Sequence, residues 1–107
     1  MSAFDERERE FEARFKHDQE LQFKVNARRS KLLGLWAAEQ MGLSGAAADT
    51  YAKDVVQADF EKPGDSDIVA KVVNDLGAKG RPVTEAQVRK ELERLFAVAK
   101  EQIMKQS

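Results

Sequence analysis

The feature that most constrains the fold is the apolar segment from Ala27 to Met41, which contains the chain's one Trp, Trp36. A helix turns by about 100° per residue, so the apolar residues before and within this segment share one face. These residues are Leu21, Val25, Leu32 and Trp36. From Leu32 onward apolar residues cover most of the circumference, and a helix that is apolar nearly all round is a buried helix. We therefore expect a central helix with Trp36 inside the core.

The composition favours an all-α protein of one domain. The chain has 107 residues, and its 6 Gly and 2 Pro fall mostly where helices are expected to end. Ala, Glu, Lys, Arg, Gln and Leu, which are strong helix formers, dominate the rest. We expect a compact four-helix bundle over residues 18–107, preceded by a flexible, helix-competent arm over residues 1–17. The expected helices lie at about 18–41, 45–61, 66–76 and 85–104.

Capping residues and glycines mark the ends of the expected helices. Thr84 and Gln87 form a capping box, in which each side chain bonds the backbone N–H of the other residue. Gly42 is placed to end the central helix, as Gly commonly does. The weaker boundary signals are the caps Ser44 and Asp65 or Ser66, and the stop at Gly77. Inside the central helix, Gly34 costs about 1 kcal/mol relative to Ala. We interpret it as a point of close helix–helix approach, with a ligand at the backbone as the alternative.

The N-terminal arm carries a narrow stripe of Phe side chains in a highly charged segment. Phe4, Phe11 and Phe15 are seven and four residues apart, which places all three on one helical face. Three Phe side chains are too few to stabilise an isolated helix of this length. We interpret the arm as a segment that becomes ordered when it docks. The alternative is that the stripe packs on the protein's own core and extends the first helix.

The residues of this chain do not indicate an enzyme. The chain has no Cys and one His, His17, which argues against a zinc site and excludes a thiol nucleophile. No Ser stands near a credible base, and the loop from Gly77 to Val83 lacks the phosphate-loop pattern. We interpret His17 as an ordinary surface residue, with pH sensing as the alternative. Trp36 is interpreted as a core residue rather than a platform for a cofactor.

The sequence also argues against membrane insertion and nucleic-acid binding. No apolar run approaches the roughly 20 residues that a membrane helix needs, and the charged N-terminus lacks the apolar core of a signal peptide. The net charge is −1, so no overall field attracts nucleic acid. Lys24, Arg28 and Lys31 share one face that could contact phosphates or an acidic protein surface, although a solvated face is the alternative. Without exposed aromatic side chains among them, this face does not predict nucleic-acid binding.

Several stretches of the chain resemble one known family. They are Phe4–Phe15 (FDEREREFEARF), Asp18–Lys24, Ala27–Glu39 (with RRSKLLGLW), Tyr51–Val56, Ala58–Phe60 and Pro63–Asp65. Together they are similar to the zeta-type inhibitor subunit of the alpha-proteobacterial F-type ATP synthase. The resemblance covers essentially the whole chain, and the RRSKLLGLW segment is its most specific part.

The resemblance implies a protein that inhibits ATP hydrolysis and is not itself an enzyme. Its N-terminal segment would enter the catalytic head between alpha and beta subunits and reach the gamma subunit, while the bundle stays outside as an anchor. The expected partner-binding residues are Phe4, Arg7, Arg9, Phe11, Arg14 and Phe15. The protein would be cytoplasmic, peripheral to the inner membrane through the synthase, and monomeric when isolated.

Two other function classes stay open at this point. One is an adenine-nucleotide-binding regulatory module that uses Lys24, Arg28 and Lys31; apart from such a nucleotide, no cofactor is expected. The other is a non-inhibitory assembly or scaffold protein.

Overall fold

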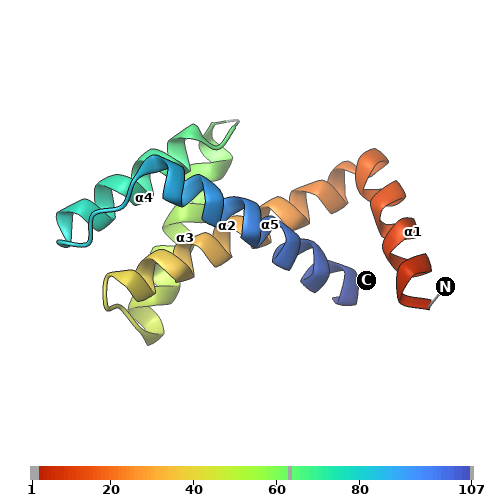
Figure 1. The fold of residues 1–107 in the computed structure, drawn as a ribbon, viewed down its shortest axis with the longest axis horizontal. Helices are drawn as coiled ribbons and strands as arrows, with labels where there is room; N and C mark the ends of the chain where they lie inside the picture. The colour runs from red at the N-terminus through yellow and green to blue at the C-terminus, as the bar shows by residue number, and fades with distance from the viewer. Residues whose placement is uncertain (1–2, 63, 107) are drawn as a thin grey trace.

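The part of the chain that the structure describes forms five helices. The computed structural model describes residues 3–62 and 64–106, with side chains described from residue 6 onward. The helices are α1 (Ala3–His17), α2 (Gln19–Gln40), α3 (Gly45–Glu61), α4 (Ser66–Ala78) and α5 (Glu85–Gln106) (Figure 1). The described residues contain no strand, so the all-α prediction is confirmed. The expected arm forms a fifth helix, and the molecule is elongated, with extents of 47 × 26 × 26 Å.

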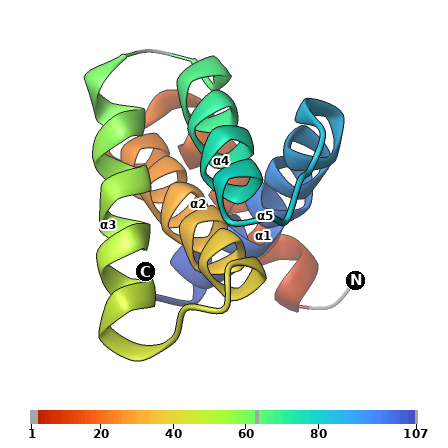
Figure 2. The same cartoon turned by 90° about the vertical axis from the view of Figure 1, so that its left-hand side faces the viewer.

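Helix α2 is the central element, as the sequence predicts. It contacts each of the other four helices, and α3, α4 and α5 surround its second half (Figure 2). Helix α1 lies beyond the other end of α2, near the C-terminus of the chain (Figure 1). Leu33, Ala37 and Ala38 in the apolar segment from Ala27 to Met41 are therefore buried, because three helices cover this part of α2.

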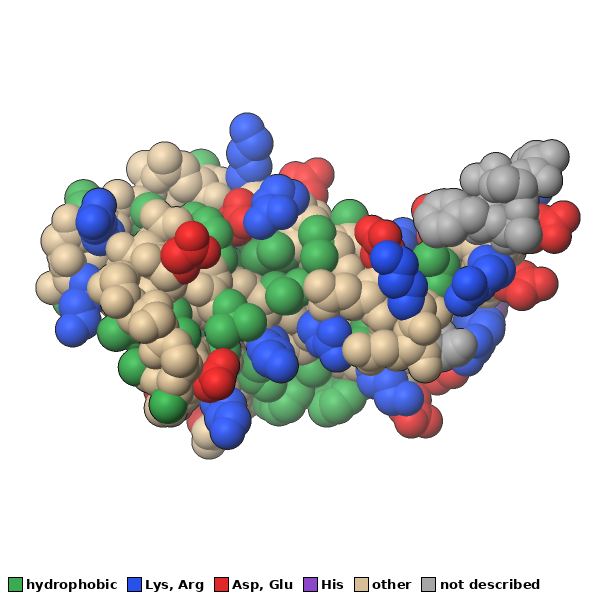
Figure 3. Space-filling view, turned by 90° about the horizontal axis from the view of Figure 1, so that it is seen from below, with side chains coloured by type: hydrophobic (Ala, Val, Ile, Leu, Met, Phe, Trp, Pro, Cys, Tyr) green, Lys and Arg blue, Asp and Glu red, His purple; other side chains and the backbone are tan. Residues whose placement is uncertain are grey.

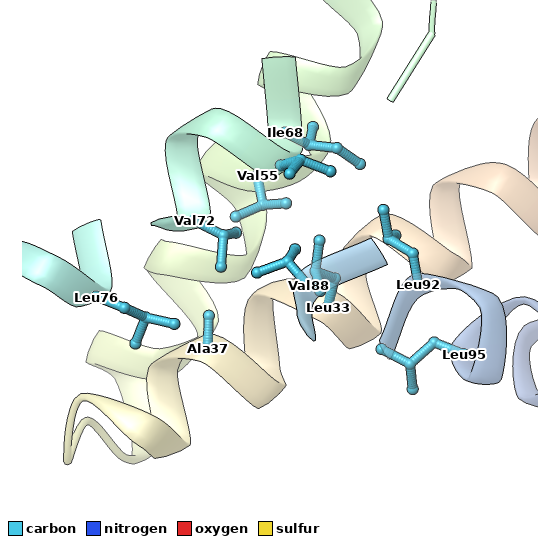
Figure 4. Close-up of a cluster of buried hydrophobic side chains, with 10 residues drawn as sticks. Leu33, Ala37, Val55, Ile68, Val72, Leu76, Val88, Leu92 and Leu95 are labelled. Atoms are coloured by element: carbon cyan, nitrogen blue, oxygen red, sulfur yellow. The ribbon is translucent and has the colours of Figure 1, made fainter. Parts of the chain in front are cut away.

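The main core lies where α2, α3, α4 and α5 meet. Its side chains are apolar residues at helical spacing on each helix, and all are nearly or completely buried. They are Leu33, Ala37, Val55, Ile68, Val69, Val72, Leu76, Val88, Leu92 and Leu95 (Figure 4). The stripes on the four helices thus converge on one cluster, which is the arrangement that makes each amphipathic helix stable.

Helices α2 and α3 approach each other closely at Gly34. A Cβ atom added there would lie 2.6 Å from the Cα atom of Ala52 on α3, which is far inside van der Waals contact. The absence of a side chain at Gly34 is therefore what allows the two backbones to pack at this distance. The interpretation of Gly34 as a point of close helix approach is confirmed.

Most of the predicted helix boundaries agree with the structure. The capping box is present: the Thr84 N–H donates to Gln87 Oε1 at 2.8 Å, and the Gln87 N–H donates to Thr84 Oγ1 at 3.1 Å. After α2, Gly42 has a φ of +79°, and the Leu43 N–H donates to the Ala38 carbonyl at 2.9 Å. This is the hydrogen-bond pattern of a glycine-terminated helix.

The predicted stop at Gly77 is wrong. Helix α4 continues through Gly77 to Ala78, because Gly77 keeps a helical backbone. The left-handed residue that ends the helix is Gly80, with a φ of +75°, and the following Arg81 N–H donates to the Leu76 carbonyl at 2.9 Å. Helix α5 likewise continues to Gln106, two residues beyond the expected end.

Trp36 is not a full core residue, so its predicted burial needs correction. Its side chain is only partly buried and packs against the edge of the main core. The fully buried positions of α2 near it are small, notably Gly34, Ala37 and Ala38. The indole ring of Trp36 therefore packs at the rim of the main core.

The close approach at Gly34 predicts an unusual response to Ala. Gly34→Ala should destabilise the protein by about 1–3 kcal/mol, because the added methyl group meets the backbone of Ala52 and forces the helices apart. The measurement is the free energy of unfolding in urea. The matched control is Gly77→Ala, which lies in a helix with open space around it; it should be neutral or stabilise by up to about 1 kcal/mol. Equal effects at both positions would contradict the packing argument.

Candidate functional site

Helix α1 is a separate unit joined to α2 at Asp18. The backbone at Asp18 is extended, with φ −106° and ψ 103°, and its carboxylate accepts the Leu21 N–H at 3.2 Å, which caps α2. The chain therefore changes direction at this residue, and α1 and α2 do not form one continuous helix (Figure 1). The expectation that the Phe stripe extends the first helix is wrong in this respect.

The Phe stripe of α1 packs on the protein's own core. Phe11 is 3% exposed, and the ring of Phe15 lies edge-on to Phe96 of α5, with 5.7 Å between the ring centroids. These rings belong to a second core cluster made by α1, the first half of α2 and the last turns of α5. Its buried members are Phe11, Leu21, Val25, Ala99, Ile103 and Met104. Phe4 lies outside the residues whose side chains the structure describes.

Two polar contacts also hold the second half of α1. Glu12 forms an ion pair with Lys100 of α5, and the side-chain amide of Gln22 donates to the Phe15 carbonyl at 2.7 Å. By contrast, residues 6–10 in the first half of the helix are all exposed. The contacts described above thus attach α1 through Phe11, Glu12 and Phe15.

The three Arg side chains expected to bind a partner are exposed. Arg7 and Arg9 lie on the exposed first half of α1, and Arg14 lies near the junction with α2. Arg14 also lines a hollow of about 670 Å³ that runs from α1 along α2. Phe11 and Phe15 thus face inward while the Arg side chains face solvent, so the structure divides the predicted partner-binding residues between two faces.

The predicted basic residues of α2 line this same hollow. Lys24, Arg28 and Lys31 all border it, so the structure brings together the residues that the sequence placed on one face. Arg28 donates to the side-chain oxygen of Gln102 at 2.8 Å, and Lys24 is paired with Glu20 at 3.5 Å.

An exposed aromatic pair that the sequence analysis missed lies beside these basic residues. Phe23 of α2 and Phe60 of α3 are 56% and 51% exposed, and their rings stack with 5.0 Å between centroids. The premise that no exposed aromatic side chain lies among the basic residues is therefore wrong. Leu21 and Val25 are inward positions of α2, and Phe23 lies two residues from each, on the opposite side of the helix. This spacing was the signal in the sequence that could have identified Phe23 as exposed.

Apolar side chains also reach the surface elsewhere. On the face shown in Figure 3, hydrophobic side chains lie open between Lys and Arg side chains over the wider part of the molecule. Mixed surfaces of this kind are common on proteins, so we attach significance only to the stacked pair of Phe23 and Phe60.

The remaining polar contacts between helices are structural. Arg29 of α2 donates to both carboxylate oxygens of Asp65, at 2.6 and 3.4 Å, and Ser30 donates to Asp59 at 2.8 Å. The hydroxyl of Tyr51 donates to Asp75 at 2.8 Å, and burial, reinforced by this carboxylate, raises the pKa of Tyr51 well above its usual value. Tyr51 is therefore a neutral hydrogen-bond donor that ties α3 to α4 rather than a titrating group.

Metal binding and membrane insertion receive no support from the part of the chain that the structure describes. No three His, Cys, Asp or Glu side chains gather there in an arrangement that could hold a metal ion. Among the described helices, none combines the length and hydropathy that a membrane crossing requires.

Comparison with known proteins identifies the family. The sequence pattern of the family "ATPase inhibitor subunit zeta" matches residues 1–102. The chain belongs to this family. Among solved structures, the chain is similar to a protein whose structure was determined in solution by NMR. The two sequences are 50% identical, the TM-score is 0.71, and the match covers 81% of this chain and 99% of that one. No curated protein matches the chain significantly.

Membership in the ATPase inhibitor subunit zeta family confirms the resemblance that the sequence suggested. It supports ATPase inhibition as the general activity and assigns the chain to a family of regulatory subunits. The match begins at residue 1 and so includes all of α1.

The contacts of Phe11 predict how α1 is held. Phe11→Ala should release α1, because truncating a buried Phe typically costs about 3–5 kcal/mol and the rest of the attachment is small. The measurement is amide hydrogen exchange, with faster exchange expected in α1 from Phe11 to His17 and unchanged exchange in the main core. The control is Arg7→Ala, at an exposed position. If the exchange of α1 is unaffected by the loss of Phe11, the second cluster does not hold the helix in place.

Proposed function

We propose that this zeta-family subunit inhibits ATP hydrolysis by inserting its N-terminal segment into the catalytic head of the F-type ATP synthase. Residues 1–17 would enter between alpha and beta subunits and reach the gamma subunit, and residues 18–107 would stay outside as an anchor. The protein would then act in the cytoplasm, at the inner membrane, through its attachment to the synthase. Family membership supports inhibition in general, and the architecture of the chain supports this route.

The observation that carries the proposal is that α1 is separable from the main core. Among the residues of α1 whose side chains the structure describes, none belongs to the main cluster, and the extended backbone at Asp18 provides a natural hinge. Residues 6–10 of α1 are exposed, so a partner could reach this part of the helix while it is docked. Release of α1 would thus leave the packing of α2, α3, α4 and α5 around Leu33 unchanged.

Insertion would require α1 to exchange its own contacts for those of the partner. Phe11 and Phe15 would leave the second cluster, and exposing one such side chain costs about 1.5–3 kcal/mol. A released state that costs about 3 kcal/mol is populated at under about 1%. The partner must therefore offer apolar pockets to the Phe side chains, and a deep interface between two subunits is a surface of this kind.

The side chains of α1 suit such an exchange. Phe4, Phe11 and Phe15 would serve as apolar anchors on one face of the inserted helix. Arg7, Arg9 and Arg14 would fix its register through the charges of the surrounding subunits, since charge complementarity determines orientation and rate more than affinity.

A second candidate function is adenine-nucleotide binding, favoured by the shape of the hollow. Its volume of about 670 Å³ falls within the usual range of about 300–1,000 Å³ for ligand sites. Lys24, Arg28 and Lys31 border it and could pair with phosphates, while Phe23 could stack on a base. A scaffold function without inhibition is the third class, and it is separated by an ATP hydrolysis assay with the purified synthase.

The Phe15–Phe96 contact allows an experiment that separates the two roles of the arm. Phe15→Ala and Phe96→Ala both remove this contact, but only Phe15 would be an anchor on the catalytic head. Phe15→Ala should weaken inhibition at least about tenfold, since losing an interface anchor costs about 2 kcal/mol or more. Phe96→Ala should leave inhibition unchanged or strengthen it, because it lowers the cost of release. The measurement is the concentration that gives half-maximal inhibition of synthase ATP hydrolysis.

Deletion of Met1–His17 is the complementary control and should abolish inhibition. The deletion exposes Leu21 and Ile103, so the melting temperature should fall, but the helix content of residues 18–107 should persist because the main core is intact. Equal weakening by Phe15→Ala and Phe96→Ala would indicate that α1 inhibits while it is docked on its own core. Full inhibition by the truncated chain would place the inhibitory surface on residues 18–107.

The nucleotide hypothesis makes its own prediction. ATP should shift the NMR amide signals of Lys24, Arg28 and Lys31, and Lys31→Ala should weaken this binding because it removes a charge that would pair with a phosphate. Lys90→Ala is the matched control, since Lys90 is also exposed but lies on α5, outside the residues that border the hollow. Unchanged signals at millimolar ATP would exclude the site.

A further inference from the structure

The stacked rings of Phe23 and Phe60 form an unusual surface. They are the two large hydrophobic side chains that stand exposed among the described residues, and they lie together on α2 and α3. Burying aromatic side chains is strongly favourable, and aromatic residues are enriched at the centres of protein interfaces. A pair of rings that is more than half exposed is therefore a candidate contact point for a partner.

A long groove runs beside these two rings. The hollow of about 670 Å³ includes Phe23, and a second hollow of about 490 Å³ includes Phe60. The two hollows share Lys31 and Val56, so they form one groove along α2 and α3. Its length spans both hollows, whereas a nucleotide would fill only one of them. An amphipathic helix with apolar side chains at intervals of three and four residues fits a groove of this form.

The charges along the groove favour an acidic occupant. Within the described part of the chain, neither Lys31 nor Lys53 has a carboxylate within ion-pair distance, and Arg28 bonds only the neutral side chains of Gln102 and Gln106. Asp18 and Glu20 border the first hollow and Asp49 borders the second, and these carboxylates offset part of the positive charge. Lys31, Lys53 and Arg28 would then pair with carboxylates on either side of the apolar stripe of a bound helix.

The groove is continuous with the N-terminal helix. Arg14 of α1 and Asp18 at the junction line the first hollow together with Phe23. Asp18 and Phe23 are five residues apart, which is about 7–8 Å along a helix. A partner that receives α1 would therefore lie next to the groove.

We propose that this groove, with Phe23 and Phe60 at its centre, is a second docking surface that binds an acidic amphipathic helix on the outside of the catalytic head. The proposal rests on the proposed function, because it names the surface by which α2–α5 would be anchored while α1 is inserted. Release of α1 from its own core costs free energy, and a second contact beside it would offset part of that cost by raising the local concentration of the arm.

The first test compares surface variants of the full-length chain. A variant that combines Phe23→Ser, Phe60→Ser and Lys31→Glu should raise the concentration for half-maximal inhibition at least tenfold. Inhibition at saturating concentration should stay complete, because the arm is intact. Lys90→Glu, a charge reversal at an exposed position of α5, is the matched control and should have no effect. Circular dichroism should show the same melting temperature, within a few degrees, for both variants.

The second test locates the contact directly. The chain contains no Cys, so Gln57→Cys creates one labelling site for a photoreactive benzophenone, at an exposed residue that borders the groove. Irradiation of the complex with the purified catalytic head should crosslink this site to an acidic helical segment of a head subunit. The same label at Lys90→Cys should crosslink weakly.

The outcomes separate this inference from the proposed function. Inhibition by the three-substitution variant at the unchanged concentration, or equal crosslinking from both labelled sites, would overturn the docking surface and leave the function intact. The unmodified chain could instead sediment as a dimer that the three-substitution variant loses, with inhibition unchanged. That result would show that the groove binds a second copy, and it would also overturn the proposed docking surface. If the unmodified chain binds the head without inhibiting it, the proposed function fails, and crosslinking still decides where the chain docks.

Discussion

The close approach of α2 and α3 at Gly34 is the constraint on which the rest of the structure depends. It sets the distance between the central helix and its neighbour, because the Cα atom of Ala52 occupies the space that any side chain at Gly34 would need. The two helices run in opposite directions, so residues before Gly34 face residues after Ala52. This register brings Ser30 to Asp59 and Phe23 to Phe60. The same packing thus creates the exposed aromatic pair.

The extended backbone at Asp18 divides the protein into a main core and a smaller second cluster. Leu33 and its neighbours are buried by α3, α4 and α5, whereas Phe11 is buried by the ends of α2 and α5. Because the two clusters share no buried residue, the second can open while the first stays closed. A chain built in this way can release α1 at the cost of the contacts of the second cluster rather than of its whole fold.

Under the proposed function, the Phe side chains of α1 and those of the groove start from different surroundings in the free protein. Phe11 and Phe15 pack on the protein's own core and must leave it to bind the catalytic head. Phe23 and Phe60 are already exposed and need no rearrangement. A first contact through the exposed pair would be fast, and insertion of α1 would follow as a slower step. In this scheme the groove confers the initial attachment, and the arm confers the inhibition.

The sequence alone determined the helices and the family. Apolar spacing and the Thr84–Gln87 capping box are local signals, so they located α2, α3 and α5 to within about two residues, and the RRSKLLGLW segment indicated the zeta-type subunit that the comparisons confirm. It also placed Lys24, Arg28 and Lys31 on one face. The predicted stop at Gly77 was wrong, since α4 continues to Ala78 and Gly80 is the left-handed residue that follows. Gly is compatible with both a helical and a left-handed backbone, so the sequence does not tell the two glycines apart.

Only the tertiary structure decided how deeply each aromatic side chain is buried. Periodicity tells which face of a helix is apolar, but burial depends on the distance to residues far away in the chain. Trp36 is only partly buried at the edge of the main core, Phe11 is buried against α2 and α5, and no described helix covers Phe23. These outcomes follow from how helices pack against one another, and that packing is a property of the assembled chain rather than of any one segment.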